Sequence, residues 1–142
     1  MNNEDYASYE LALKLKECGF DEPCIAQWAC EPYDKPLLFG STAFVFCNSE
    51  LKGRDVTAPF LWQAQKWLRE EYGIHIDVCT YSDYSTDADG NVCDRWDFWG
   101  FELYAIVGGK RIAIDDDEYD FYEQALSAGI AAALELIEQE KK

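Results

Sequence analysis

The clearest hydrophobic pattern in the chain lies at residues 57–81 and predicts a helix that runs directly into a strand. Thr57 is expected to cap the helix, with Pro59 in its first turn and Gly73 in the left-handed conformation that ends it. After Gly73, apolar and polar residues alternate as far as Cys79, which predicts a half-buried strand. The helical spacing comes from Phe60, Leu61, Ala64, Trp67, Leu68 and Tyr72.

Helical spacing also predicts a helix near each end of the chain. The first is expected at residues 5–18 and ends at Gly19. The last is expected to open at Asp120, where Glu123 three residues later completes the form of a capping box. The positions predicted to face inward are Leu11, Ala12, Leu15 and Cys18 in the first helix, and Tyr122, Ala125, Leu126, Gly129, Ile130, Ala133 and Ile137 in the last.

The remaining apolar segments have the alternation or the short apolar runs that are typical of strands. The pair Gly108-Gly109 predicts a hairpin turn, because glycine adopts positive φ without steric cost. Two polar stretches, residues 82–95 and 115–118, are expected to be loops. The further predicted strands are residues 24–30, 37–46 (as one strand or two), 96–107 and 110–114.

Together these elements predict an α+β fold in which three helices pack on a mostly antiparallel sheet. Their order is α-β-β-α-β-β-β-α, and the short connections favour antiparallel neighbours. At 142 residues, the chain has the usual length of one domain with a substantial core. We therefore expect a single α+β domain over residues 1–142.

Composition and charge narrow the classes of partner. Hydrophobic residues make up 49% of the chain and aromatic residues 15%, which indicates a folded protein. The 12 Lys and Arg against 28 Asp and Glu give a net charge of −16, which repels phosphate backbones and anionic membranes. We expect no direct binding of nucleic acid or membrane. The acidic surface either serves solubility or attracts a basic protein partner, and the chain is expected to be a monomer or a homodimer.

The N-terminus and the cysteines indicate a reducing compartment. The first ten residues are acidic and polar, unlike a secretory signal, and no apolar run approaches the roughly 18 residues of a membrane span. The six cysteines form no C-x-x-C pair, and the single histidine leaves no zinc-ligand set. We expect a cytoplasmic protein with free thiols and no cofactor.

One acidic segment follows part of a calcium-binding loop. In residues 85–96 the candidate ligands are Asp87, Asp89 and Asp94, but the twelfth position is Trp96 where a calcium loop has a bidentate glutamate. The alternative is an Asp-Gly turn that joins two strands. The incomplete ligand set favours the turn.

A second acidic segment covers residues 115–120. Asp115 and Asp117 are its candidate ligands for a hard cation. The alternative is a solvated link whose carboxylates favour the start of the following helix, because a helix N-terminus carries partial positive charge. The pattern favours the link.

Catalytic motifs are weaker still. His75 and Asp77 share one face of the predicted strand, but residues at i and i+2 lie about 7 Å apart, so direct contact is left open. The sequence contains no nucleophile elbow, phosphate-binding glycine loop or dinucleotide fingerprint. It therefore favours a non-enzymatic protein, with a metal-dependent enzyme or a calcium-binding domain as the alternative.

Tryptophans mark a candidate interaction surface. Trp62 falls beside Lys66 and Arg69 on the polar side of the central helix, where burial in the monomer is not required. An exposed tryptophan there indicates a contact surface, whereas the alternative is that Trp62 covers the edge of the sheet. Trp99 is a further candidate for the interaction surface. It faces the opposite side of its predicted strand from Trp96, as in a sheet that is covered on both faces or joined to a partner.

The segment from residue 57 to the C-terminus runs α-β-β-β-α, which is similar to the order of elements in double-stranded RNA-binding domains. In that family, basic residues at the start of the last helix grip phosphates. Here residues 115–118 and Asp120 occupy those positions and are acidic. The resemblance thus implies a shared order of elements, and the charge suggests a mimic of nucleic acid that inhibits a host nucleic-acid-binding protein.

Most of the chain resembles small uncharacterised proteins encoded in prophages and mobile elements of gut Bacteroides and their relatives. The matching pieces are LALKLKECGFDEPC, TAPFLWQAQKWLREEYGIHIDV and YEQALSAGIAAALELI. Phage ABA sandwich domains are similar in outline. The resemblance implies a mobile-element accessory protein and supplies no site residue or cofactor. We thus predict an acidic, non-enzymatic protein of this kind that binds another protein.

Overall fold

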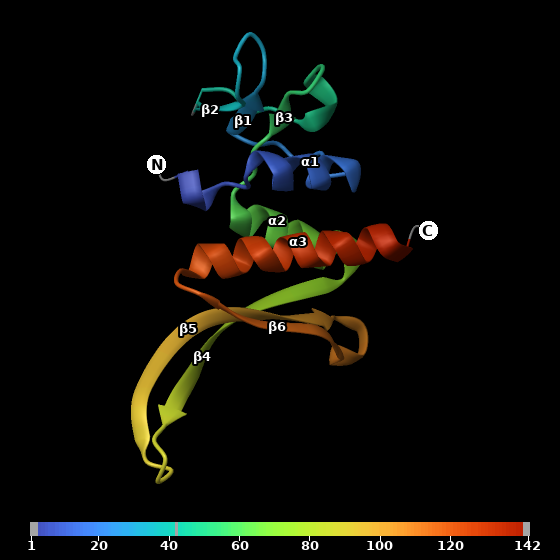
Figure 1. Cartoon of the computed structure of the whole chain (residues 1–142). Coiled ribbons are helices and arrows are strands. Elements are labelled where there is room, and N and C mark those ends of the chain that lie inside the picture. Colours follow the sequence, from blue (N-terminus) through green and yellow to red (C-terminus); the bar gives the residue numbers. More distant parts are fainter. Residues whose placement is uncertain (1–2, 42, 141–142) are drawn as a thin grey trace.

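A computed structural model describes residues 3–41 and 43–140, except for the side chain of residue 116, and it confirms the α+β class with three helices (Figure 1). The helices are α1 (Tyr9–Glu17), α2 (Leu61–Tyr72) and α3 (Tyr122–Glu140), and short 3₁₀ turns lie at η1 (Asn3–Asp5), η2 (Asn48–Glu50) and η3 (Val107–Gly109). The strands are β1 (Ala26–Ala29), β2 (Leu37–Gly40), β3 (Val56–Thr57), β4 (Ile74–Thr86), β5 (Val92–Ala105) and β6 (Arg111–Tyr119).

The strands form two antiparallel sheets and not the one sheet that we expected. One has the order β2-β1-β3 and the other β4-β5-β6. In Figure 1 the small sheet and α1 lie on one side of α2 and α3, and the second sheet lies on the other side. A single hydrophobic cluster nevertheless joins the layers, since Val56 of β3, Leu15 of α1 and Leu103 of β5 belong to it.

The predicted start of α2 was wrong by several residues. Thr57 is not the N-cap but a residue of β3, where it pairs with Gln27 of β1 and its N–H donates to Asn48 Oδ1 at 2.9 Å. Pro59 precedes the helix, which begins at Leu61. Because the backbone of Thr57 is paired with β1, this residue belongs to the small sheet and does not cap the helix. The predicted end is confirmed, because Gly73 has φ 65° and ψ 28°.

Both predicted polar loops around the second sheet were wrong. Strand β4 continues to Thr86 and β5 begins at Val92, so residues 82–95 are mostly a hairpin with a short connection. Residues 115–118 lie within β6. Backbone pairing in a ladder does not require apolar side chains, and polar ones remain in solvent when neither face is covered. The predicted turn at Gly108-Gly109 is confirmed, with φ of 87° and 61°.

The outer helices also begin later than predicted. In α1 the cap is Ser8, whose Oγ accepts the Leu11 N–H at 3.2 Å, and the chain before it forms η1. In α3 the predicted capping box paired Asp120 with Glu123, but the bond from a side chain back to the backbone is formed one residue later. There Gln124 Oε1 accepts the Phe121 N–H at 3.3 Å. The inward faces of both helices are as predicted apart from Tyr122, which is exposed.

Helix α3 packs across the second sheet at close range. Gly129 faces Ile76 of β4 and Phe101 of β5, which are both buried. None of the helices in the described part of the chain combines the length and the apolar character that crossing a membrane requires.

Candidate functional site

An exposed aromatic stack lies at the start of α2. The ring of Trp62 is stacked on Phe60 at a centroid distance of 5.7 Å, and Phe60 is stacked on Tyr6 at 4.7 Å. Tyr6 is buried, Phe60 is half-buried and Trp62 is 59% exposed, so the stack runs from the core to the surface. Trp62 therefore presents an open aromatic face, which is the condition that we set for a contact surface.

Local structure fixes this stack. Tyr6 and Phe60 form an isolated antiparallel bridge, and the Ala7 N–H donates to the Pro59 carbonyl at 2.8 Å. The buried stripe of α2 sets the rotation of the helix, so that Trp62, Lys66 and Arg69 all lie on the face away from the stripe. Trp62 and Lys66 are exposed there, and Arg69 is half-buried. Lys66 lies 3.9 Å from Glu70, an exposed pair of little energetic weight. The three predicted helix residues thus share one face.

Hollows flank Trp62 on both sides. One of about 310 Å³ reaches from Trp62 towards Glu22 and Ile25. Another, of about 260 Å³, lies between Trp62 and the first turn of α3, where Tyr122 and Glu123 line it. We use the name Trp62 surface for the residues Tyr6, Phe60, Trp62, Lys66, Tyr122 and Glu123.

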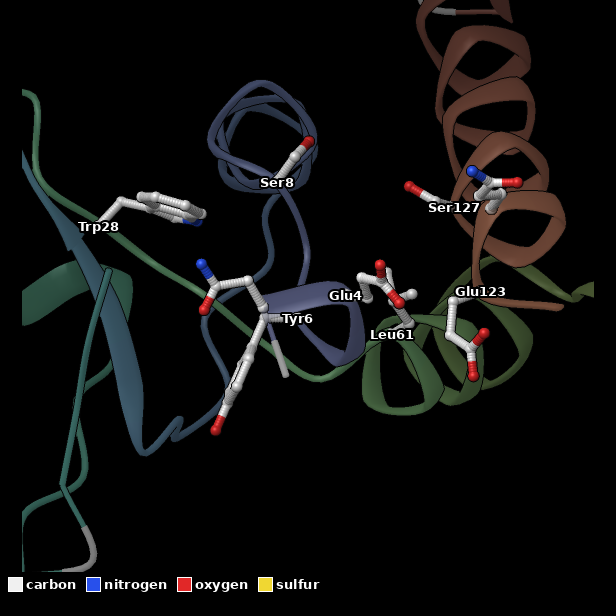
Figure 2. A pocket seen from close by; sticks show the side chains of 9 residues that line it. Glu4, Tyr6, Ser8, Trp28, Leu61, Glu123 and Ser127 are labelled. Carbon is white, nitrogen blue, oxygen red and sulfur yellow. The ribbon is translucent and has the colours of Figure 1, made fainter. Parts of the chain in front are cut away.

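A third hollow, of about 350 Å³, adjoins this surface because its lining shares Tyr6 and Glu123 with it. Figure 2 shows Trp28 on one side of this hollow and Ser127 of α3 on the other. The indole of Trp28 is held by its Nε1, which donates to the Ala7 carbonyl at 2.9 Å. Among the described residues, the lining includes the carboxylates of Glu4 and Glu123 and no Lys or Arg, so a cationic side chain would find favourable charge there.

Trp99 lies next to the same region. Its ring meets Tyr122 edge-on at 5.3 Å, and the side chain is half-buried against the start of α3. Since Tyr122 also lines the hollow beside Trp62, Tyr122 is a neighbour of both predicted tryptophans. Trp99 therefore supports the surface more than it extends it.

The acids predicted for the calcium-like loop occupy the tip of the β4–β5 hairpin. Asp87 Oδ1 accepts the N–H groups of Asp89 and Asn91, both at 2.9 Å, and these bonds, led by that of Asn91, hold the pKa of Asp87 below its ordinary value. Asp94 lies on β5 opposite Ser85. The geometry is that of a turn whose aspartate caps its own backbone. Metal binding at this loop stays a prediction.

The second predicted acidic set lies on β6. Asp115 Oδ1 accepts the Asp117 N–H at 2.9 Å, and its other oxygen accepts the Tyr119 hydroxyl at 3.3 Å. Among the described side chains, neither predicted set brings three ligand atoms of His, Cys, Asp or Glu within 4.8 Å of one another. These positions also stay predictions.

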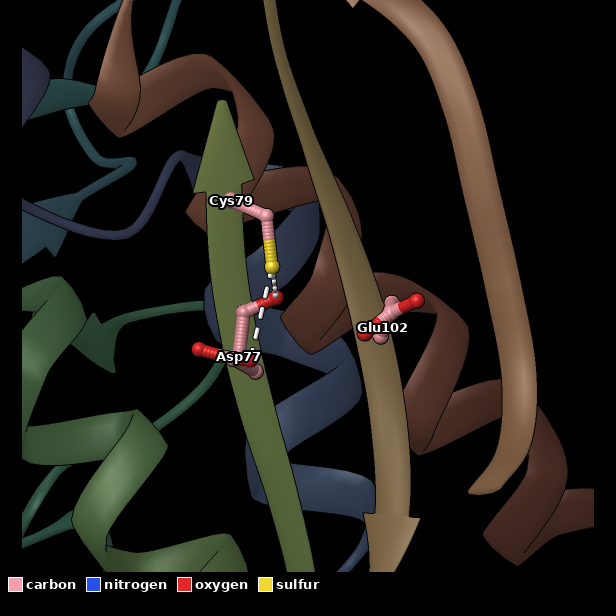
Figure 3. A group of neighbouring side chains, drawn as sticks. All are labelled: Asp77, Cys79 and Glu102. Atoms are coloured by element: carbon pink, nitrogen blue, oxygen red, sulfur yellow. Dashed lines mark hydrogen bonds between the residues drawn. The ribbon is translucent and has the colours of Figure 1, made fainter. Parts of the chain in front are cut away.

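Such a group does occur where the sequence analysis did not place one. Figure 3 shows Asp77 and Cys79 on β4 with Glu102 on β5, and their ligand atoms lie within 4.8 Å of one another. Asp77 and Glu102 are directly opposite in the ladder. Only the strand register reveals this pairing, since the two acids are 25 positions apart in the chain. His75 is not a member of this group among the described residues, and its buried Nδ1 has no hydrogen-bond partner among them.

Hydrogen bonds within the sheet occupy the side chains of this group. The Cys79 thiol donates to Asp77 Oδ2 at 3.3 Å, and burial together with that carboxylate raises the thiol pKa to about 11. Glu102 Oε2 accepts the Tyr104 hydroxyl at 2.6 Å, and its Oε1 lies 3.2 Å from Arg111 Nη1. The thiol is therefore protonated at neutral pH, and Glu102 is already paired.

Comparison with known proteins identifies no relative of this chain. No protein-family model matches the chain, and neither the curated proteins nor the solved structures yield a match. Among the described residues, the aromatic stack offers an exposed indole at Trp62, and the hollows beside it are lined by carboxylates.

Proposed function

We propose that the chain is a non-enzymatic, acidic interaction protein that binds another protein through the Trp62 surface. The observation that carries the proposal is the open face of Trp62, 59% exposed on a stack that is rooted in the core. Tryptophan is enriched among the residues that dominate interface energies, and rigid support lowers the entropy lost on binding. The hollows on either side of Trp62 would receive the partner's side chains.

The partner that suits this surface has apolar side chains for the stack and basic ones for the rim. Glu4, Asp5 and Glu123 line the two hollows at the start of α3, and Glu22 lines the hollow on the other side of Trp62. We place the protein among cytoplasmic accessory proteins of phages or mobile elements, in line with the resemblance noted in the sequence. Its partner would then be a protein of the host or of the same element.

The test is capture from native-host lysate by the immobilised chain, read by mass spectrometry. Trp62→Ala removes the open indole, and Phe44→Ala is the matched control because Phe44 is 67% exposed on a different segment. We expect wild type and Phe44→Ala to capture the same protein and Trp62→Ala to capture about tenfold less. Capture should persist in about 0.5 M salt, because apolar contacts are not screened. Equal capture by all three proteins would contradict the proposal.

A further inference from the structure

The second sheet has one face that no described element covers. Strand residues alternate between its faces, so Ile76 and Leu103 point to the helices while Asp77 and Glu102 point the other way. In Figure 1 all three helices of the described chain lie on the first side. We use the name uncovered face for the second side.

Acidic and aromatic pairs succeed one another along this face. Register places Tyr81 opposite Phe98, with the rings stacked at 5.8 Å. The next pair outward is Asp83 and Trp96, and beyond it lies Ser85 with Asp94. The indole Nε1 of Trp96 donates to Glu118 Oε1 at 2.8 Å, which brings a carboxylate from the direction of β6. The face therefore presents aromatic rings bordered by carboxylates.

The distal half of the hairpin leaves the body of the protein. Every residue from 82 to 97 is exposed, and Figure 1 shows this part of β4 and β5 extending past the helices. Trp96, on the uncovered face, is 37% exposed. Tyr84, which by alternation points to the opposite side of the hairpin, and Val92 near the tip are 60% and 61% exposed. A two-stranded ribbon is marginal in water on its own, and exposed apolar groups rimmed by polar ones are typical of an interaction site.

The net charge of this sheet indicates which kind of partner fits the uncovered face. Residues 77–120 hold 12 acids against three bases, a net charge of −9 out of −16 for the whole chain. One of the three bases, Arg111, is paired with Glu102 inside the sheet. A second copy of this chain would meet like charge, as would a phosphate backbone. A lysine- and arginine-rich surface would meet both opposite charge and the rings that its aliphatic stems and guanidinium groups favour.

We propose that the uncovered face, with the protruding hairpin, docks onto a basic surface of a partner protein. This interface is separate from the Trp62 surface and does not depend on it. The carboxylates of Asp83, Asp94 and Glu118 pair with lysine and arginine of the partner, and Trp96 lies along their stems. Because the contact is mostly ionic, it forms quickly and weakens with salt.

The test uses a fluorescein-labelled peptide of alternating arginine and lysine, about twelve residues long, in about 50 mM salt. The face variant carries Asp83→Asn, Asp94→Asn and Glu118→Gln. The control variant carries Glu17→Gln, Glu71→Gln and Glu135→Gln, which lie exposed on the three helices and give the same net charge. We expect about tenfold weaker binding by the face variant and less than about twofold by the control, because each ion pair contributes modestly.

Two further readouts separate the outcomes. On addition of the peptide to wild type, backbone NMR signals of residues 80–98 should shift, which requires no variant. Because these shifts locate the peptide on the uncovered face, failure of the Trp62 proposal would leave this one standing. Equal weakening of the face and control variants would overturn the proposal in favour of bulk charge. Dimers that form through this face without peptide would overturn it in favour of a second copy.

Discussion

At the scale of single residues, Gly129 allows α3 to approach the second sheet. A Cβ built at this position would lie 2.7 Å from Ile76 Cγ2 and 3.2 Å from Phe101 Cγ. Those atoms belong to buried side chains that have little freedom to move. Glycine is normally unfavourable inside a helix, so close packing here overrides helix propensity.

Gly129→Ala should therefore lower the free energy of unfolding by about 1–3 kcal/mol, the usual cost of overpacking. The opposing gain in helix propensity is at most about 1 kcal/mol. Urea denaturation followed by circular dichroism would measure the change. Ser127→Ala introduces the same side chain into the same helix and should stay within about 0.5 kcal/mol of wild type. A more stable Gly129→Ala protein would show that the two layers are not packed as described.

Cys79 gives a pH dependence whose sign follows from its pKa. Burial, and then the Asp77 carboxylate, raise the thiol pKa from 9.0 to about 11, so the folded state favours the neutral thiol. The resulting contribution to stability is fully present below about pH 9 and is lost as the pH rises through about 11. The difference in unfolding free energy between wild type and Cys79→Ala should shrink over that window.

Urea titrations of both proteins at several pH values between 8 and about 11 would measure this difference. The control is Cys93→Ala, which removes an exposed thiol. A difference between wild type and Cys79→Ala that stays constant across the window would contradict the assigned cause. Absorbance of the thiolate offers a second readout, since the part that Cys79→Ala removes should titrate near 11.

At the scale of elements, strands β4 and β5 each have an inner part packed under the helices and an exposed outer part. We call the outer part of the hairpin, residues 82–97, the arm. Their inner ends carry Ile76, Phe101 and Leu103, which are buried under the helices. Their outer ends keep the ladder as far as the pair of Thr86 and Val92, yet no residue from 82 to 97 is buried. The same hairpin thus combines a stable base with an outer part that only backbone bonds and cross-strand pairs support.

Hydrogen exchange should resolve these two halves. We expect amides at residues 83–86 and 92–96 to exchange at least about 100-fold faster than those of Ile76 and Leu103, because local opening of the arm exposes no core. The inner ends of the same strands serve as the internal control. Equal protection along the whole hairpin would mean that something holds the arm, and addition of the basic peptide should produce that protection.

At the scale of the whole molecule, the two sheets differ in how they are used. The small sheet contacts α1, and Ala26 of β1 clusters with Tyr6 and Phe60, which belong to the stack that ends at Trp62. Among the described elements, α2 and α3 cover one side of the second sheet and none covers the other. Residues 77–120, which include most of this sheet, carry more than half of the net charge. The molecule therefore offers two chemically different surfaces, one aromatic with acidic hollows and one mainly ionic.

The sequence by itself determined the three helices, their buried stripes and the turns at Gly73 and Gly108-Gly109. These features depend on local spacing and on backbone conformations that few residues adopt. It also indicated Trp62, Lys66 and Arg69 as one face of α2, because helical phase alone separates them from the buried stripe. Their role in binding stays a prediction.

The tertiary structure alone decided the division into two sheets, the strand at Thr57, the length of the hairpin and the group of Asp77 with Glu102. Each of these depends on pairing between residues far apart in the chain, and a backbone ladder leaves little trace in side chains that face solvent on both sides. Local patterns of apolar and polar residues predict which side chains are buried. Which strands meet, and which face remains open, is settled only when the layers pack.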